Sequence, residues 1–89
     1  MRQYKTLLQV FLRNSIYTYR KEKGYSQERM AELLHISPRS YIDQEHGKYS
    51  FSALSVIFFL ISIPEELVLS LLRAFKKLVQ EEEEHGDVA

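Results

Sequence analysis

The 89-residue chain is predicted to fold as an all-α protein of five helices, in a single domain spanning residues 1–89. Apolar residues recur at three- and four-residue spacing, which is the spacing of amphipathic helices. Ser residues or Ser-Pro pairs that cap helix starts, and Gly residues that end helices, separate the periodic segments from one another. Hydrophobic residues make up 45% of the chain, which is ordinary for a folded domain.

The first helix is expected over residues 4–22, as an extended N-terminal helix. Its apolar face consists of residues at helical spacing: Leu8, Leu12, Ile16 and Tyr19. Gly24 follows, and glycine commonly ends helices because it adopts a left-handed backbone conformation at little cost. The first helix is therefore expected to stop just before this glycine.

Two short helices are expected next, over about 27–34 and 38–46. Ser26 caps the first of them, because its hydroxyl accepts a hydrogen bond from an otherwise unpaired backbone N–H. Ser37 caps the second, and Pro38 takes the first helical position, where its missing N–H costs nothing. Only a tight turn is left between the two helices.

The fourth helix is expected to begin after Ser52 and to end at about Ser62. It is apolar on nearly every side, so we expect it to be covered all round. Its β-branched and aromatic residues also allow a buried strand. Helix is favoured because both neighbouring segments are helical in pattern and no partner strand is visible.

A long C-terminal helix is expected over residues 65–84, after Pro64. Apolar residues form one continuous stripe along it: Leu67, Val68, Leu71, Leu72, Phe75, Leu78 and Val79. The N-terminal helix and this helix are expected to be longer than the three helices between them.

The charges are divided unevenly along the chain. Residues 1–51 carry nine Lys or Arg against five Asp or Glu, whereas residues 52–89 carry three against seven. The formal net charge of zero thus separates into halves of +4 and −4. A basic half followed by an acidic half is typical of a protein that presents one end to DNA.

Several classes of function find no support in the sequence. The chain has no Cys, its three His residues show no metal-ligand spacing, and no glycine-rich phosphate loop or catalytic triad is visible. The longest apolar run, residues 56–61, is far below the ~20 residues that span a bilayer, and no signal peptide is evident. We therefore expect a cytoplasmic protein that is not an enzyme, with no cofactor or metal, no membrane association and no evident small-molecule ligand.

The segment from Gly24 to Gly47, GYSQERMAELLHISPRSYIDQEHG, resembles the helix-turn-helix of the phage repressor/Cro-type (XRE-like) family of small bacterial transcriptional regulators. The resemblance covers about residues 13–63, with the helix-turn-helix proper at 26–46. It implies a lambda-repressor-like fold and sequence-specific binding of double-stranded DNA by a nucleoid-associated, repressor-like regulator. Helix 38–46 would read the major groove.

The resemblance also implies roles for individual residues. Base contacts fall to four residues of the recognition helix: Pro38, Arg39, Ile42 and Asp43. Phosphate contacts fall to residues at helix starts and just past the recognition helix: Gln27, Ser37, Lys48 and Tyr49. Family members join an Arg late in the first helix to a Glu at the end of the recognition helix, and these residues correspond to Arg20 and Glu45. Ala31 is the small residue that lets the two helices approach closely.

Three positions depart from the family pattern. His35 replaces a turn glycine and must take a left-handed or nearby conformation. Tyr41 replaces an aliphatic inner residue. Gln44 places a polar amide on the inner side, where it needs hydrogen-bond partners. These departures put in question how the recognition helix is set, but not the fold.

A homodimer is expected, because two copies on a near-palindromic site read enough base pairs for useful specificity. The interface is assigned to the C-terminal helix, at Leu71, Leu78 and Val79. Alternatively, the long helices and the fourth helix cover one another within a monomer. An alternative function is a protein-interaction module or antitoxin-like partner that keeps the fold without specific DNA binding, which the acidic C-terminal half and Asp43 favour.

Overall fold

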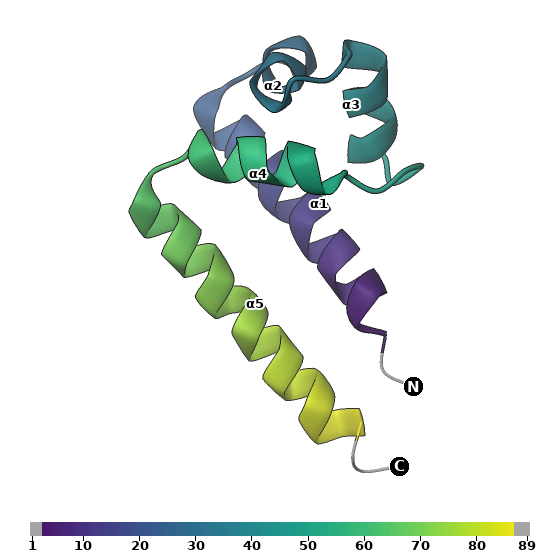
Figure 1. The fold of residues 1–89 in the computed structure, drawn as a ribbon, viewed down its shortest axis with the longest axis vertical. Helices are drawn as coiled ribbons and strands as arrows, with labels where there is room; N and C mark the ends of the chain where they lie inside the picture. Colours follow the sequence, from purple (N-terminus) through teal and green to yellow (C-terminus); the bar gives the residue numbers. More distant parts are fainter. Residues whose placement is uncertain (1–2, 87–89) are drawn as a thin grey trace.

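A computed structural model describes residues 3–86. Figure 1 shows the three short helices gathered at the top of the view, with the two long helices extending downward from them. The elements in chain order are α1 (Tyr4–Lys23), α2 (Gln27–Leu34), α3 (Pro38–Glu45), α4 (Ala53–Ile61) and α5 (Glu65–Gly86). The described residues form five helices and no strand, so the all-α prediction is confirmed. The alternative of a buried strand in the fourth segment is wrong.

The helix boundaries differ little from those expected. The largest difference is at the end of α5, which continues past the expected end at residue 84 to Gly86. Glutamate is a good helix former, and the acidic run at residues 81–84 therefore keeps helical conformation although its charges oppose the helix dipole. Residues 1–2 and 87–89 of the predicted domain lie outside the described part.

Serine hydroxyls cap the three short helices. The Ser26 Oγ accepts a hydrogen bond from the Arg29 N–H at 3.0 Å, and the Ser37 Oγ accepts one from the Ser40 N–H at 3.1 Å. Ser52 caps α4 in the same way. Each hydroxyl satisfies a backbone donor that has no partner within its helix, which defines where the helix begins.

The first four helices, α1, α2, α3 and α4, share one hydrophobic core. Its buried members come from each of these helices and from the residue before Pro64: Ile16, Tyr19, Met30, Ala31, Leu34, Tyr41, Phe59 and Ile63. The Tyr19 and Phe59 rings meet edge to face, with centroids 5.7 Å apart. No residue of α5 whose side chain is described is fully buried, so α5 lies outside this core.

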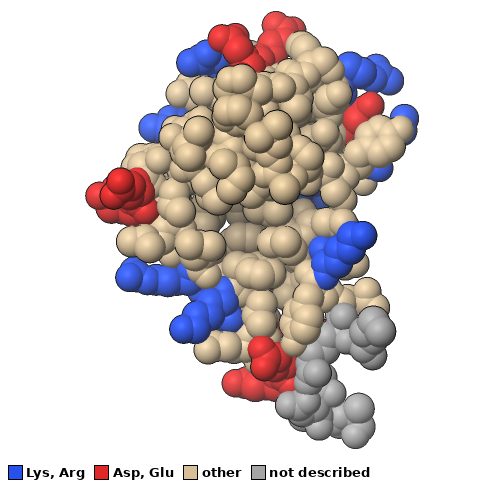
Figure 2. Space-filling model, in the orientation of Figure 1, with Lys and Arg blue, Asp and Glu red and all other residues tan. Residues whose placement is uncertain are grey.

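One face of α4 is left uncovered by the rest of the described chain, so the expected cover on every side is not supplied within one chain. Leu54, Ile57 and Ile61 are 65%, 53% and 71% exposed. The opposite side of α4 packs into the core through Ser55 and Phe59. Figure 2 shows no charged side chain of the described residues on the surface over α4. The Lys, Arg, Asp and Glu side chains in this view lie at the margins of that surface.

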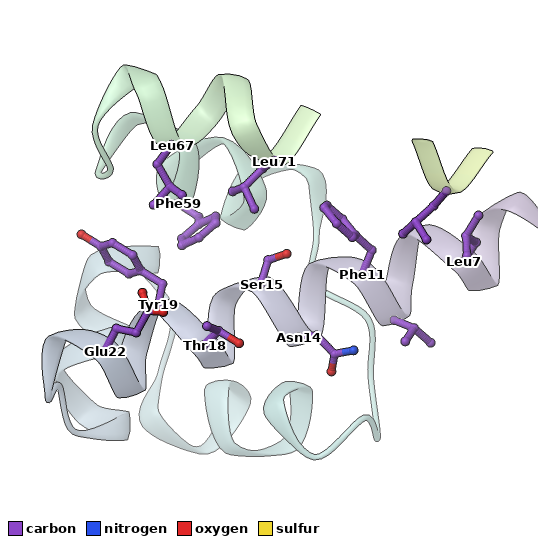
Figure 3. Close-up of a pocket in the computed structure, with 12 residues that line it drawn as sticks. Leu7, Phe11, Asn14, Ser15, Thr18, Tyr19, Glu22, Phe59, Leu67 and Leu71 are labelled. Carbon is purple, nitrogen blue, oxygen red and sulfur yellow. The ribbon is translucent and has the colours of Figure 1, made fainter. Parts of the chain in front are cut away.

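Helix α5 packs along the N-terminal half of α1, with the Phe11 and Phe75 ring centroids 5.3 Å apart. Figure 3 shows Leu71 on α5 and Phe11 on α1 on facing sides of a hollow between the two helices. This hollow has a volume of about 480 Å³, and Leu78 also lines it. The apolar stripe of α5 is thus turned toward α1 without filling the space between them.

Candidate nucleic-acid interface

A tight turn at His35 sets the relation between α2 and α3. His35 has φ 60° and ψ 40°, so the predicted left-handed conformation is confirmed. Its imidazole stacks on the Phe58 ring with centroids 3.8 Å apart. Because Phe58 belongs to α4, this stacking ties the turn to a third helix.

The side of α2 next to this turn is closely packed. Ala31 is 1% exposed, and its carbonyl accepts a hydrogen bond at 3.0 Å from the N–H of Ile36 in the turn. A larger side chain at this position would occupy space between the helices of the motif. The small residue therefore permits the close approach on which a helix-turn-helix depends.

An ion pair joins the end of α1 to the end of α3. The Arg20 Nε donates to the Glu45 Oε1 at 2.7 Å, and the two side chains are only 11% and 4% exposed. Arg20 also donates from Nη1 to the Tyr25 carbonyl at 3.0 Å. These are the two residues that the family resemblance implies, and their contact links the recognition helix to the first helix.

Two more side chains complete the coordination of the Glu45 carboxylate. The Gln27 amide donates to Oε2 at 2.6 Å, and the Tyr41 hydroxyl donates to Oε1 at 3.2 Å. The Gln27 side chain is thus occupied inside the protein, and its backbone N–H at the start of α2 is the group left to meet a phosphate. Tyr41, fully buried in place of the usual aliphatic residue, uses its hydroxyl in this cluster.

The cluster changes the proton affinity of its members. Burial by itself would raise the pKa of Glu45, but the hydrogen bonds from Gln27 and Arg20 and the charge of Arg20 outweigh it, so the pKa lies below its ordinary value. Burial opposes the charged form of Arg20, yet the contact with Glu45 raises the pKa of the guanidinium. Burial raises the pKa of Tyr41, and the neighbouring carboxylate raises it further. Glu45 is therefore ionised and Tyr41 neutral at pH 7.

The four predicted base-contact residues occupy the first two turns of α3. Pro38 is exposed, and the Arg39 side chain is 82% exposed. Ile42 and Asp43 are half-buried. The Arg39 Nε lies 3.6 Å from the Asp43 Oδ2, so this pair partly neutralises the single cation of α3.

The remaining predicted phosphate contacts lie at both ends of α3. Ser37 is exposed, but its Oγ already caps the helix and donates to Ser40. Lys48 and Tyr49 are both exposed, and the Lys48 ammonium lies 5.5 Å from the centre of the Tyr49 ring. The structure thus places an ammonium near an exposed tyrosine ring just past the recognition helix.

The three residues predicted for a dimer interface are half-buried rather than exposed. Leu71 and Leu78 line the hollow toward α1, and Val79 lies beside Leu78 in sequence. The exposed apolar residues of α5 are Leu69 and Leu72.

Arg13 is a further basic residue of this region that the sequence analysis did not identify. Its Nη1 lies so near Gly47 that a Cβ added to Gly47 would be 2.5 Å from it. A signal was available, because Arg13 precedes Arg20 by seven residues, and residues seven apart lie on the same face of a helix.

Residues 3–86 hold neither a membrane-spanning helix nor a cluster of metal-ligating side chains. No helix there is both long enough and apolar enough to cross a membrane. Within the same part of the chain, no three acidic or His side chains are grouped as they would be around a metal ion. The polar side chains described above instead gather around Glu45 at the end of α3.

Comparison with known proteins gives one match. A family described as Helix-turn-helix matches residues 16–58, from the middle of α1 to α4. No curated protein and no solved structure matches the chain. The matched residues include the two short helices, the capped turn between them and the Arg20–Glu45 pair. The match supports the phage repressor/Cro-type helix-turn-helix family, whose members are DNA-binding transcription regulators.

Proposed function

We propose that this protein is a sequence-specific, repressor-like regulator that reads double-stranded DNA in the cytoplasm with α3. The single observation that carries the proposal is the accessibility of the start of α3. Pro38 and Arg39 are exposed there while the far end of the helix is anchored through Glu45. An anchored helix with an exposed N-terminal turn is the geometry by which a recognition helix presents side chains to base edges.

Arg39 is the strongest candidate for reading a base, because its planar fork can donate to both acceptors of guanine. Its ion pair with Asp43 would be exchanged for the base on binding. Ile42 would pack on a thymine methyl group, and Asp43 could accept a hydrogen bond from a cytosine amine. Figure 2 supports the proposal that the side of α3 faces DNA, since basic side chains lie along the edge beside α3, with an acidic one among them.

We also propose that the protein acts as a homodimer. Leu54, Ile57 and Ile61 of α4 and Leu72 of α5 are exposed, and Ile57 and Leu72 line one hollow. Monomers rarely leave large apolar patches open to solvent. The incompletely filled hollow beside Leu71 and Leu78 adds apolar surface on α5. A second copy of the chain is the partner that a palindromic DNA site requires.

The test of DNA reading begins with enrichment of a binding site from a random duplex library at low salt. Binding is then measured for wild type, Arg39→Ala and Lys48→Ala on the enriched site and on a scrambled duplex. Arg39→Ala should cost about 1–3 kcal/mol on the enriched site and little on the scrambled one. Lys48→Ala should weaken both alike, because phosphates carry no sequence information.

Each result has a distinct meaning. Equal losses on the two duplexes for Arg39→Ala would show that Arg39 meets only phosphate. If wild type retains no duplex even at low salt, the DNA-reading proposal fails. The exposed apolar surface would then favour the alternative of a protein-interaction module.

A further inference from the structure

We infer that a small polar hollow between α1 and the loop after α3 binds a phosphate of the DNA backbone through Arg13 and Lys48. This inference rests on the proposed DNA binding and extends the interface onto α1. The hollow has a volume of about 210 Å³, and its polar lining includes Arg13, Gln44, Lys48, Tyr49 and Ser50. None of the residues that line it is acidic, so the two cations meet no opposing charge there.

Arg13 is unusual among the arginines of residues 3–86. The guanidinium groups of Arg20, Arg29 and Arg39 each pair with a carboxylate. Arg13 makes no ion pair and no hydrogen bond with any described residue, although it is half-buried. Arg73 is also unpaired, but it is exposed and water solvates it.

The N–H donors of Arg13 are not used by any described residue, and the side chain lines the hollow. A guanidinium has five N–H donors, and removing it from water without an acceptor is unfavourable. The same hollow holds a second unsatisfied group, since the Gln44 Oε1 is buried and accepts no hydrogen bond. Arg13 and Gln44 line the same hollow, where a phosphate would supply acceptors for the guanidinium donors.

The backbone around Gly47 is suited to this arrangement. Gly47 has φ +83°, a conformation that favours glycine, and it lies directly against the Arg13 guanidinium. The absence of a side chain there lets Arg13 lie against the turn that leads to Lys48. Arg13 and Lys48 thus flank one polar opening, just beyond the end of the recognition helix.

The experiment measures how duplex affinity changes with salt for wild type, Arg13→Gln and Lys48→Gln, with Arg73→Gln as the matched control on α5. Each phosphate contact contributes about 0.9 to the slope of log affinity against log salt. Arg13→Gln should lower the slope by that amount. The ratio of affinities at 50 and 200 mM salt should then shrink about 3.5-fold. Arg73→Gln should leave the slope unchanged.

A second pair of variants separates phosphate binding from folding. In Gly47→Ala the new Cβ would lie 2.5 Å from the Arg13 Nη1, so the guanidinium must leave its present position while its charge is kept. Gly24→Ala places the same residue at a similar φ of +68°, but its Cβ has no neighbour within 4 Å. We expect Gly47→Ala to lose salt slope as Arg13→Gln does, and Gly24→Ala to lose only thermal stability.

The outcomes that overturn the inference can be distinguished. Wild-type binding with an unchanged slope for both Arg13→Gln and Gly47→Ala would reject the phosphate site and leave the proposed function standing. Failure of wild type to bind any duplex would reject both together. Circular dichroism at the assay temperature shows whether each variant is folded, and a folded variant with the wild-type slope counts against the inference.

Discussion

At the residue scale, Glu45 is the centre of the structure that holds the recognition helix. It accepts hydrogen bonds from side chains on three helices: Arg20 on α1, Gln27 on α2 and Tyr41 on α3 itself. A buried charge with several donors is stable only while those donors remain. Loss of either member of the ion pair leaves its partner charged, buried and without compensation.

The Arg20–Glu45 pair should therefore dominate acid stability. Because the pKa of Glu45 is lower in the folded state than its ordinary value of 4.5, the pair contributes stability above that value. This stability is lost as the pH falls through the folded pKa. Glu45→Ala should lower the free energy of unfolding by about 3–5 kcal/mol at pH 7 and flatten its dependence on pH in the acid range.

Urea denaturation from pH 3 to pH 7 measures both effects. The matched control is Glu81→Gln, which removes an exposed carboxylate on α5 and should change stability by no more than about 0.5 kcal/mol. An acid dependence as steep in Glu45→Ala as in wild type would assign the acid sensitivity to other carboxylates.

At the scale of elements, the turn between α2 and α3 depends on an unfavoured backbone conformation. His35 holds φ 60° where a glycine would meet no steric cost, and its ring stacks on Phe58. The stacking compensates for part of the backbone strain by attaching the turn to α4. The geometry of the motif thus depends on a helix that lies outside it.

The left-handed conformation at His35 predicts that glycine is a more stable replacement than alanine there, which is the reverse of the order inside a helix. His35→Ala loses the stacking and keeps the strain, whereas His35→Gly loses the stacking and relieves the strain. His35→Gly should therefore be more stable than His35→Ala by about 1 kcal/mol, measured by thermal or urea unfolding.

Gln80 on α5 provides the comparison, because it is exposed and lies within a helix. There the usual preference holds, and Gln80→Ala should be more stable than Gln80→Gly by about 1 kcal/mol. The same order at both positions would mean that residue 35 does not keep a left-handed conformation in solution.

At the scale of the whole molecule, apolar surface is unevenly distributed. The first four helices share one core, while α5 lies along α1 with hollows between these two helices. The uncovered side of α4 carries no charge in the part of the chain that the structure describes (Figure 2). This distribution predicts association in solution.

Sedimentation at micromolar concentration should give the mass of a dimer for wild type. Two double variants locate the interface: Ile57→Glu with Ile61→Glu on α4, and Leu71→Glu with Leu78→Glu on α5. Charges placed in an apolar interface should dissociate the dimer. Glu65→Gln with Glu66→Gln, on an exposed part of α5, serves as the control.

The results separate the alternatives. A monomeric wild type rejects the dimer. Dissociation by the α4 pair alone places the interface on the exposed face of that helix. Dissociation by the α5 pair alone assigns it to the stripe that the sequence indicates.

Much of the fold was accessible from the sequence because its signals are local. Ser26, Ser37 and Ser52 cap their helices through hydrogen bonds within three residues, and such bonds depend only on neighbouring sequence. The left-handed His35 follows from the family pattern, since the residue replaces a turn glycine. Periodicity likewise sufficed to place α1 and α5, because an apolar stripe records which side of a helix is buried.

The tertiary structure decided what depends on residues distant in sequence. Gln27 is turned inward because Glu45, eighteen residues later, offers a carboxylate oxygen at 2.6 Å. Arg13 becomes a candidate phosphate contact because the loop at Gly47 folds back against its guanidinium. A sequence pattern records that a residue is apolar or charged. Which distant group satisfies a buried donor, and which side of an apolar helix stays uncovered, is determined only when the helices pack.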